Sequence, residues 1–192
     1  MRSLVMRDLE TGSEWSHLLG ASMAGKLKGQ TLKPLITDMV TWEAWKAKHP
    51  DSTVLNMSNT SREYTRDFYR NPKQFVYGFE VGDQAYLLPM EKMQEHSVHS
   101  FELSGVNYVA TFDKLGAATY LFASKLDDKL LEFQPIDERL VEDLQTGSHW
   151  DRSSGTAVAG ELTGAKLTAY FGMMSYRTAW LNFHPKSIEI QF

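Results

Sequence analysis

Apolar and polar residues alternate in several runs along the middle of the chain. A two-residue period places successive side chains on opposite faces, which is typical of half-buried β-strands. The expected strands cover residues 74–81, 84–88, 98–103, 107–112, 118–124 and 129–133. Turn residues such as Gly82-Asp83 and Asp127-Asp128 separate them, so we expect mostly antiparallel pairing between neighbouring strands.

Short helices are predicted at two places. In residues 41–50, Trp45 and His49 are four positions apart and would share one helix face. Thr41 can cap the start of this helix, and a proline ends it. Residues 175–185 repeat the arrangement with their own tryptophan, histidine and proline.

The two ends of the chain carry the same sequence pattern. The run Asp-Leu-Glu-Thr-Gly-Ser-Glu-Trp at residues 8–15 recurs as Asp-Leu-Gln-Thr-Gly-Ser-His-Trp at residues 143–150, and residues 8–55 align with 143–190 without a gap. Glycine adopts conformations that other residues avoid, and tryptophan fills large core volumes, so segments that share both should share a backbone path. The residues expected to carry this shared architecture are Asp8, Thr11, Gly12, Ser13, Trp15 and Trp45, paired with Asp143, Thr146, Gly147, Ser148, Trp150 and Trp180.

These patterns predict an α+β fold that is mostly antiparallel β. The fold would contain an internally duplicated unit, with one short tryptophan-containing helix closing each copy. We expect a single domain over residues 1–192, with a partial first repeat plus a loop in residues 1–73 and the second repeat in residues 74–192. If Trp45 and Trp180 are both buried, replacing either by alanine should lower the free energy of unfolding by roughly 3–5 kcal/mol.

Composition narrows the possible functions. The chain has 192 residues, of which 42% are hydrophobic, and a net charge of -4. It has no cysteine, which excludes disulfides, thiolate metal sites and cysteine nucleophiles in this chain. The slight negative charge argues against a nucleic-acid partner, because such proteins usually carry a basic surface. No apolar run approaches the roughly 20 residues of a membrane-spanning helix, and the first residues show no targeting signal.

Histidines are the first candidates for chemistry. His49 and His184 stand at equivalent helix ends, where an imidazole could contact a ligand or act as an acid or base. Alternatively, each caps its helix and packs on the preceding tryptophan. His96 and His99 would point to opposite faces of a strand, which does not suit convergent metal ligands. We therefore expect no metal and no cofactor.

Hydroxyl and aromatic residues are the other candidates. Ser13 and Ser148 lack the Gly-x-Ser-x-Gly pattern of an exposed nucleophile, so turn formation explains them better and no catalytic residue is predicted. Tyr64, Arg66 and Tyr69 belong to a run in which aromatic and charged residues interleave. Such a cluster suits recognition of a ligand or a partner surface, although a loop that packs its aromatic rings over the core is the alternative.

The order of the motifs resembles a bacterial family, the domain of unknown function 3179 family. The resemblance is carried by Asp-x-x-Thr-Gly-Ser-x-Trp, Ala-Gly-x-Leu-x-Gly-x-x-Leu and Trp-x-x-Trp-x-x-x-His-Pro-Asp-Ser in residues 8–52, and by the second Thr-Gly-Ser-x-Trp block with the closing helix. It covers nearly the whole chain. Family members usually have a front section with a Cys-Pro-x-Cys-like stretch, which is absent from this sequence. Only seven residues precede Asp8, whereas a strand-rich stretch precedes Asp143, so the front of the first unit is expected to be missing.

The family has no established activity, so the resemblance does not supply a reaction. We expect a non-catalytic binding or accessory module for an unknown small-molecule ligand. The alternative is a redox-linked or hydrolytic enzyme of the same family whose reactive front section is missing here. The resemblance also implies an extracytoplasmic location, in the periplasm or at the cell surface. Open strand edges in an incomplete first unit would allow a homo-oligomer or a partner chain to pair there.

Overall fold

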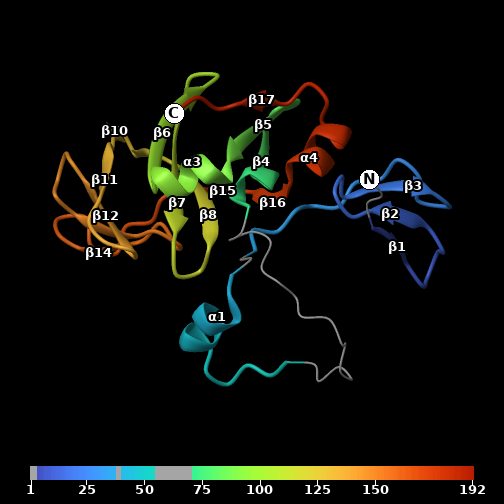
Figure 1. The fold of residues 1–192 in the computed structure, drawn as a ribbon, viewed down its shortest axis with the longest axis horizontal. Coiled ribbons are helices and arrows are strands. Elements are labelled where there is room, and N and C mark those ends of the chain that lie inside the picture. Colours follow the sequence, from blue (N-terminus) through green and yellow to red (C-terminus); the bar gives the residue numbers. More distant parts are fainter. Residues whose placement is uncertain (1–3, 38–39, 55–70) are drawn as a thin grey trace.

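The computed structural model describes residues 4–37, 40–54 and 71–192, and it is rich in mostly antiparallel β-structure. Figure 1 shows the strands β4–β8 in the middle of the molecule, with β11–β14 at one end and the small sheet β1–β3 at the other. The helix α1 (Trp42–Lys48) begins next to the central region, where the N–H of its capping residue Thr41 donates to the carbonyl of Gly116 (3.1 Å). None of the helices in the described part of the chain has the length and apolar character of a membrane span.

Two four-stranded sheets form the centre. One contains β16 (Gly172–Tyr176), β4 (Phe75–Val81), β5 (Gln84–Pro89) and β17 (Ile188–Glu189) in that order, with β17 parallel to β5. The other contains β15 (Ala169–Tyr170), β8 (Ala118–Ala123), β7 (Val106–Asp113) and β6 (Val98–Leu103). Their alternating apolar residues form the main core, which includes Phe79, Leu88, Tyr108 and Leu121. The first five strands expected from the sequence are therefore confirmed to within one or two residues.

Two expectations about this central region are wrong. The helix α3 (Met90–Glu95) was not predicted, because six residues are too short to show a helical period. It is held by Met90 and Met93, which are both fully buried in the core. Residues 129–133 do not form one strand: β10 (Lys129–Leu130) pairs with β9 (Lys125–Leu126), and β11 (Phe133–Pro135) joins another sheet. Leu131 separates them because its side chain turns into a hydrophobic cluster.

Residues 4–54 and 140–189 contain matching elements, and we call them the first and second units. In the first unit, β1 (Val5–Arg7), β2 (Glu14–Ser16) and β3 (Ala21–Ala24) form an antiparallel sheet. In the second unit, β12 (Leu140–Asp143), β13 (His149–Asp151) and β14 (Ala157–Ala159) do the same, and β11 adds a fourth strand outside β12. The registers correspond, since Met6 is opposite Trp15 and Val141 is opposite Trp150.

The helices predicted from the tryptophan and histidine spacing are both present. The helix α1 is capped by Thr41, whose side chain accepts a hydrogen bond from the N–H of Ala44, as expected. Its counterpart α4 (Arg177–Phe183) buries Trp180 against β4, where an added Cβ on Gly78 would lie only 2.4 Å from the indole. In contrast, α1 has no buried residue, so the condition set for a large destabilisation is met by Trp180 and not by Trp45. The physical reason is that no sheet equivalent to β4 lies under α1 within the described residues.

Candidate functional site

The repeated Asp-x-x-Thr-Gly-Ser-x-Trp motif builds the same hydrogen-bonded turn twice. In the first unit, the Asp8 carboxylate accepts from the Thr11 N–H (2.6 Å) and from the Trp15 indole N–H (3.0 Å). The side chain of Ser13 bonds to the Thr11 hydroxyl (2.6 Å) and accepts from the N–H of Leu27 (3.1 Å). Hydrogen bonds from Trp15 and Thr11 lower the pKa of Asp8 to about 2, because they stabilise the charged carboxylate.

The second unit reproduces each of these bonds. Asp143 accepts from the Thr146 N–H (2.6 Å) and the Trp150 indole N–H (2.8 Å), and Ser148 bonds to Thr146 (2.7 Å) and accepts from the N–H of Leu162 (3.0 Å). Gly12 and Gly147 turn the backbone with positive φ values of 69° and 66°. Ser13 and Ser148 are completely buried, so their hydroxyls hold turns together and face no solvent.

The two repeated histidines lie in different surroundings. Each stacks on its helical tryptophan at 4.1 Å between ring centroids, His49 on Trp45 and His184 on Trp180. In both helices the backbone N–H of the histidine donates a hydrogen bond of 2.8 Å to the backbone carbonyl of the tryptophan. His49 is exposed to solvent. His184 instead lines a cavity, and its Nδ1 lies 3.4 Å from Oε1 of Glu80. The structure therefore does not bring the two histidines together. Tyr64, Arg66 and Tyr69 lie outside the described residues.

His96 and His99 do not converge on a metal position. His96 ends α3, and the ring of His99 bonds through Nε2 to the carbonyl of Gln191 (2.9 Å) and stacks on Phe192. Burial lowers the pKa of His99, because an apolar environment disfavours the imidazolium. In the part of the chain that the structure describes, no group of three or more His, Asp or Glu side chains is arranged to hold a metal ion.

A concave surface lies between the first unit and the central sheets. It consists of two adjoining cavities of about 510 Å³ and 660 Å³, which we together call the cleft. Residues that line both cavities are His17, Tyr170, Phe171 and Met173. One wall comes from β4, β8, β15 and β16, and the opposite wall comes from the segments 17–20 and 31–37 of the first unit.

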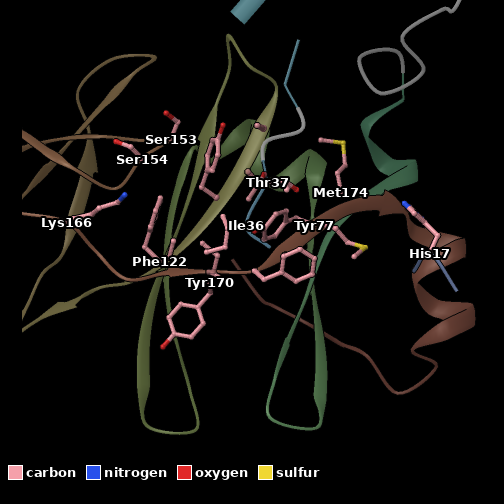
Figure 2. A pocket seen from close by; sticks show the side chains of 18 residues that line it. His17, Ile36, Thr37, Tyr77, Phe122, Ser153, Ser154, Lys166, Tyr170 and Met174 are labelled. Atoms are coloured by element: carbon pink, nitrogen blue, oxygen red, sulfur yellow. The ribbon is translucent and has the colours of Figure 1, made fainter. Parts of the chain in front are cut away.

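Polar groups sit at the ends of this cleft and apolar groups between them. Figure 2 shows Ser153, Ser154 and Lys166 on one side of the first cavity and His17 on the other, with Ile36 and Tyr77 between them. Trp180 and His184 line the second cavity. Burial raises the pKa of Tyr77 well above its usual range, so its hydroxyl stays neutral.

The hydroxyl of Ser153 is paired with a lysine, as in serine–lysine catalytic sites, but its other contacts are those of a turn. Its Oγ donates to Oδ1 of Asp151 (2.7 Å) and accepts from Nζ of Lys48 (2.7 Å). Oδ1 of Asp151 also accepts the backbone N–H groups of Ser153 and Ser154, which is the pattern of an Asx turn. Burial works to raise the pKa of Asp151, but these hydrogen bonds outweigh it and the pKa is lowered.

Sequence reasoning missed the residues that the cleft shares, above all His17. The alignment of the two units could have pointed to His17, because the second unit has Arg152 at the equivalent position. Arg152 is buried, and burial lowers its pKa. Its guanidinium donates to the carbonyls of Ser97, Phe112, Asp137 and Leu140. The same backbone position therefore stabilises the fold through Arg152 in the second unit and faces a cavity through His17 in the first. This difference makes His17 a candidate ligand-binding residue.

Comparison with known families adds one match. The family model described as "Protein of unknown function (DUF3179)" matches residues 1–72 and residues 69–187. No curated protein and no solved structure matches the chain significantly.

Proposed function

The chain belongs to the DUF3179 family of proteins of unknown function, and from the geometry of the cleft we propose that it is a non-catalytic binding module. Its ligand would be a small molecule held between the first unit and the central sheets. The observation that carries this proposal is the continuity of the two cavities, which share His17, Tyr170, Phe171 and Met173. Their volumes fall within the range of about 300–1,000 Å³ that is usual for small-molecule sites.

The lining supports a particular class of ligand. Aromatic rings and methionine side chains dominate the middle of the cleft, and methionine adapts its shape to irregular apolar ligands. The cationic groups at the margins are Lys33 and Lys166, the imidazole of His17 lies between the cavities, and Glu80 is beside His184 in the second cavity. An elongated ligand with an apolar body and an anionic group would match this arrangement, because the charge would stay near water and the body would be covered.

Two naphthalene dyes can test this proposal. We expect 8-anilinonaphthalene-1-sulfonate, which is anionic, and N-phenyl-1-naphthylamine, which is neutral, both to fluoresce on binding the full chain. Ile36→Arg places a charged side chain in the first cavity, and it should weaken the neutral dye by about tenfold or more, as loss of apolar contact predicts. The anionic dye should lose less affinity, because the added positive charge attracts its sulfonate. His17→Ala should weaken the anionic dye more than the neutral one.

Val158→Arg is the matched control, since Val158 is 50% exposed, Ile36 is 57% exposed, and Val158 lines neither cavity. This control should leave the affinity for both dyes unchanged. Equal binding of the neutral dye by the Ile36→Arg variant and the parent chain would contradict a ligand site in the cleft. An enzyme would also require turnover, which this experiment separates from binding because the dyes carry no scissile bond.

We further infer that the two units derive from duplication of one ancestral unit. The matching hydrogen bonds of Asp8 and Asp143 support this. A sample labelled at indole nitrogen should show two similarly shifted N–H resonances, one lost in Trp15→Phe and the other in Trp150→Phe. Dissimilar shifts would argue against a common geometry. The family resemblance supports an extracytoplasmic location, and recovery of the protein in the cytoplasmic fraction of its source cells would contradict it.

A further inference from the structure

The first unit has a second hollow, on the side of its sheet where Trp15 lies. It has a volume of about 640 Å³. Met6, Trp15, Leu27 and Leu32 form its apolar surface, and Arg7 and Glu10 lie at its rim; we call it the Trp15 groove. Met6 is 42% exposed and Leu32 is 52% exposed, although both are large apolar side chains. All three residues of β1 beside the groove are exposed as well.

The same place in the second unit is filled by the chain itself. Leu131 is buried there in one cluster with Val141, Trp150 and Leu167, which correspond to Met6, Trp15 and Leu32. The ring of Phe133 meets the Trp150 indole edge-on, with 5.9 Å between ring centroids. The segment Leu131-Glu132-Phe133 is therefore a template for what fits beside this tryptophan.

Backbone hydrogen bonds fix the direction of the template. Its strand β11 pairs antiparallel with β12. The N–H of Leu144 donates to the carbonyl of Glu132 (2.8 Å), and the N–H of Glu132 donates to Oε1 of Gln145 (2.8 Å). The corresponding positions in the first unit are Leu9 and Glu10. Within residues 4–37, 40–54 and 71–192, β1 pairs with β2 only, so its other edge is open.

We propose that the Trp15 groove binds an extended segment of a partner protein, which adds to β1 as an antiparallel strand. Such strand addition takes affinity from main-chain hydrogen bonds and specificity from alternate side chains. By the template, the segment carries Leu-x-Phe, with the leucine among Met6, Trp15 and Leu32 and the phenylalanine against the indole. Glu10 stands at the position of Gln145, and its carboxylate would accept the backbone N–H of the residue between the leucine and the phenylalanine, as Gln145 accepts that of Glu132.

Charge complementarity defines one further position. In the second unit, the side-chain amide of Gln134 donates to the carboxylate of Glu142 (2.7 Å). Arg7 stands at the position of Glu142, so the donor and acceptor roles are reversed. The bound segment should therefore carry an acidic residue directly after its phenylalanine, giving the pattern Leu-x-Phe-acidic. The Trp15 groove shares Leu32 with the second cavity of the cleft, but the bound strand would lie along β1 and its binding does not require a ligand in the cleft.

Labelled peptides provide the test. The first is residues 129–136 of the chain itself, Lys-Leu-Leu-Glu-Phe-Gln-Pro-Ile, and the second carries Gln134→Glu. Fluorescence anisotropy against the full chain should show binding of both, with the glutamate peptide tighter by about threefold or more. Leu131→Ala and Phe133→Ala in the glutamate peptide should each weaken binding by about tenfold.

Matched protein variants locate the site. Met6→Glu should weaken the glutamate peptide by at least tenfold. Met23→Glu should leave it unchanged, because Met23 is 41% exposed in the same sheet but does not line the groove. Arg7→Glu should reverse the preference, so that a peptide with Gln134→Lys binds more tightly than the glutamate peptide. Nonspecific adhesion to an apolar surface would not produce this reversal.

Three outcomes would overturn the proposal. The first is no binding of either peptide at millimolar concentration. The second is equal binding by the Met6→Glu and Met23→Glu variants. The third is a dimer in sedimentation experiments that Met6→Glu dissociates, since the groove would then be occupied by a second copy of the chain. Circular dichroism of the variants excludes unfolding as the cause, and Arg7→Glu provides a second change at an exposed position if Met6→Glu fails to fold.

Discussion

The two units of this protein share their local structure and differ in what covers it. Both contain the Asp–Thr–Ser–Trp turn and a helix in which a histidine stacks on a tryptophan. Val141 and Leu167 in the second unit are only 3% and 4% exposed, because β7, β8 and Leu131 pack over them. Their counterparts in the first unit are Met6 and Leu32, which are largely exposed. The short motifs are thus enough to form the hydrogen-bonded turns. Burial of the apolar side chains beside them requires a second sheet, which β7 and β8 supply to the second unit.

The largest contrast is expected at the helical tryptophans. Trp180→Ala should lower the free energy of unfolding by about 3–5 kcal/mol, because Trp180 is buried against Gly78 and leaves a cavity when truncated. Trp45→Ala should cost only about 1 kcal/mol, since Trp45 is half-buried. Urea unfolding followed by circular dichroism measures both. Equal losses of stability would mean that α1 is packed as tightly as α4. That result would contradict the difference in burial between the two units.

Leucines on the sheet faces test the same contrast with smaller side chains. Leu167→Ala should destabilise the protein by about 2–4 kcal/mol, because it removes a buried side chain from the cluster around Trp150. Leu32→Ala should change stability by less than about 0.5 kcal/mol, as is usual for exposed positions. A large loss for Leu32→Ala would show that the first unit is covered in solution, and thermal unfolding at several protein concentrations would tell whether a second copy covers it.

Glycines at equivalent turns should behave alike. Gly25 and Gly160 have φ values of 91° and 93°, and an added Cβ would lie 2.7 Å and 2.6 Å from the Cα atoms of Ser13 and Ser148. Alanine at either position should therefore destabilise its turn by about 2 kcal/mol through backbone strain and overlap. Hydrogen exchange would show whether the loss stays within one unit. A tolerated Gly25→Ala would indicate that the first turn differs from the second.

Acid should produce the smallest effect. The pKa of Asp8 is lowered to about 2, so its contribution to stability is complete above its ordinary value of 3.8 and is lost as the pH falls toward 2. The hydrogen bond from Trp15 is the largest cause of this shift. In Trp15→Phe, the carboxyl should therefore titrate nearer to 3.8, which NMR of the Asp8 side chain can measure. An unchanged pKa would mean that the turn does not depend on the indole.

Sequence reasoning found elements and motifs better than it found their surroundings. Five of the six expected strands, both tryptophan helices and the paired turns follow from local signals such as alternation, Thr41 capping and the Asp-x-x-Thr-Gly-Ser-x-Trp spacing. The helix α3 was missed because tertiary burial of Met90 and Met93 holds it, and burial leaves no mark on six residues. The cleft was missed because its walls come from segments far apart in the chain, and only the replacement of Arg152 by His17 hinted at it.

The contact between Trp180 and Gly78 has a kinetic consequence for the cleft. An indole lying directly on the backbone of β4 leaves no room for α4 to slide, so we expect the wall carrying His184 to move little. The opposite wall contains exposed residues such as Leu35 and Ile36, and the first unit is held to the rest of the described chain nearer to α1, where Thr41 bonds to Gly116. Entry and exit of the proposed ligand should therefore be timed by displacement of the segments 17–20 and 31–37. Relaxation-dispersion NMR would detect this as microsecond-to-millisecond exchange at Leu35 without exchange at the Trp180 indole.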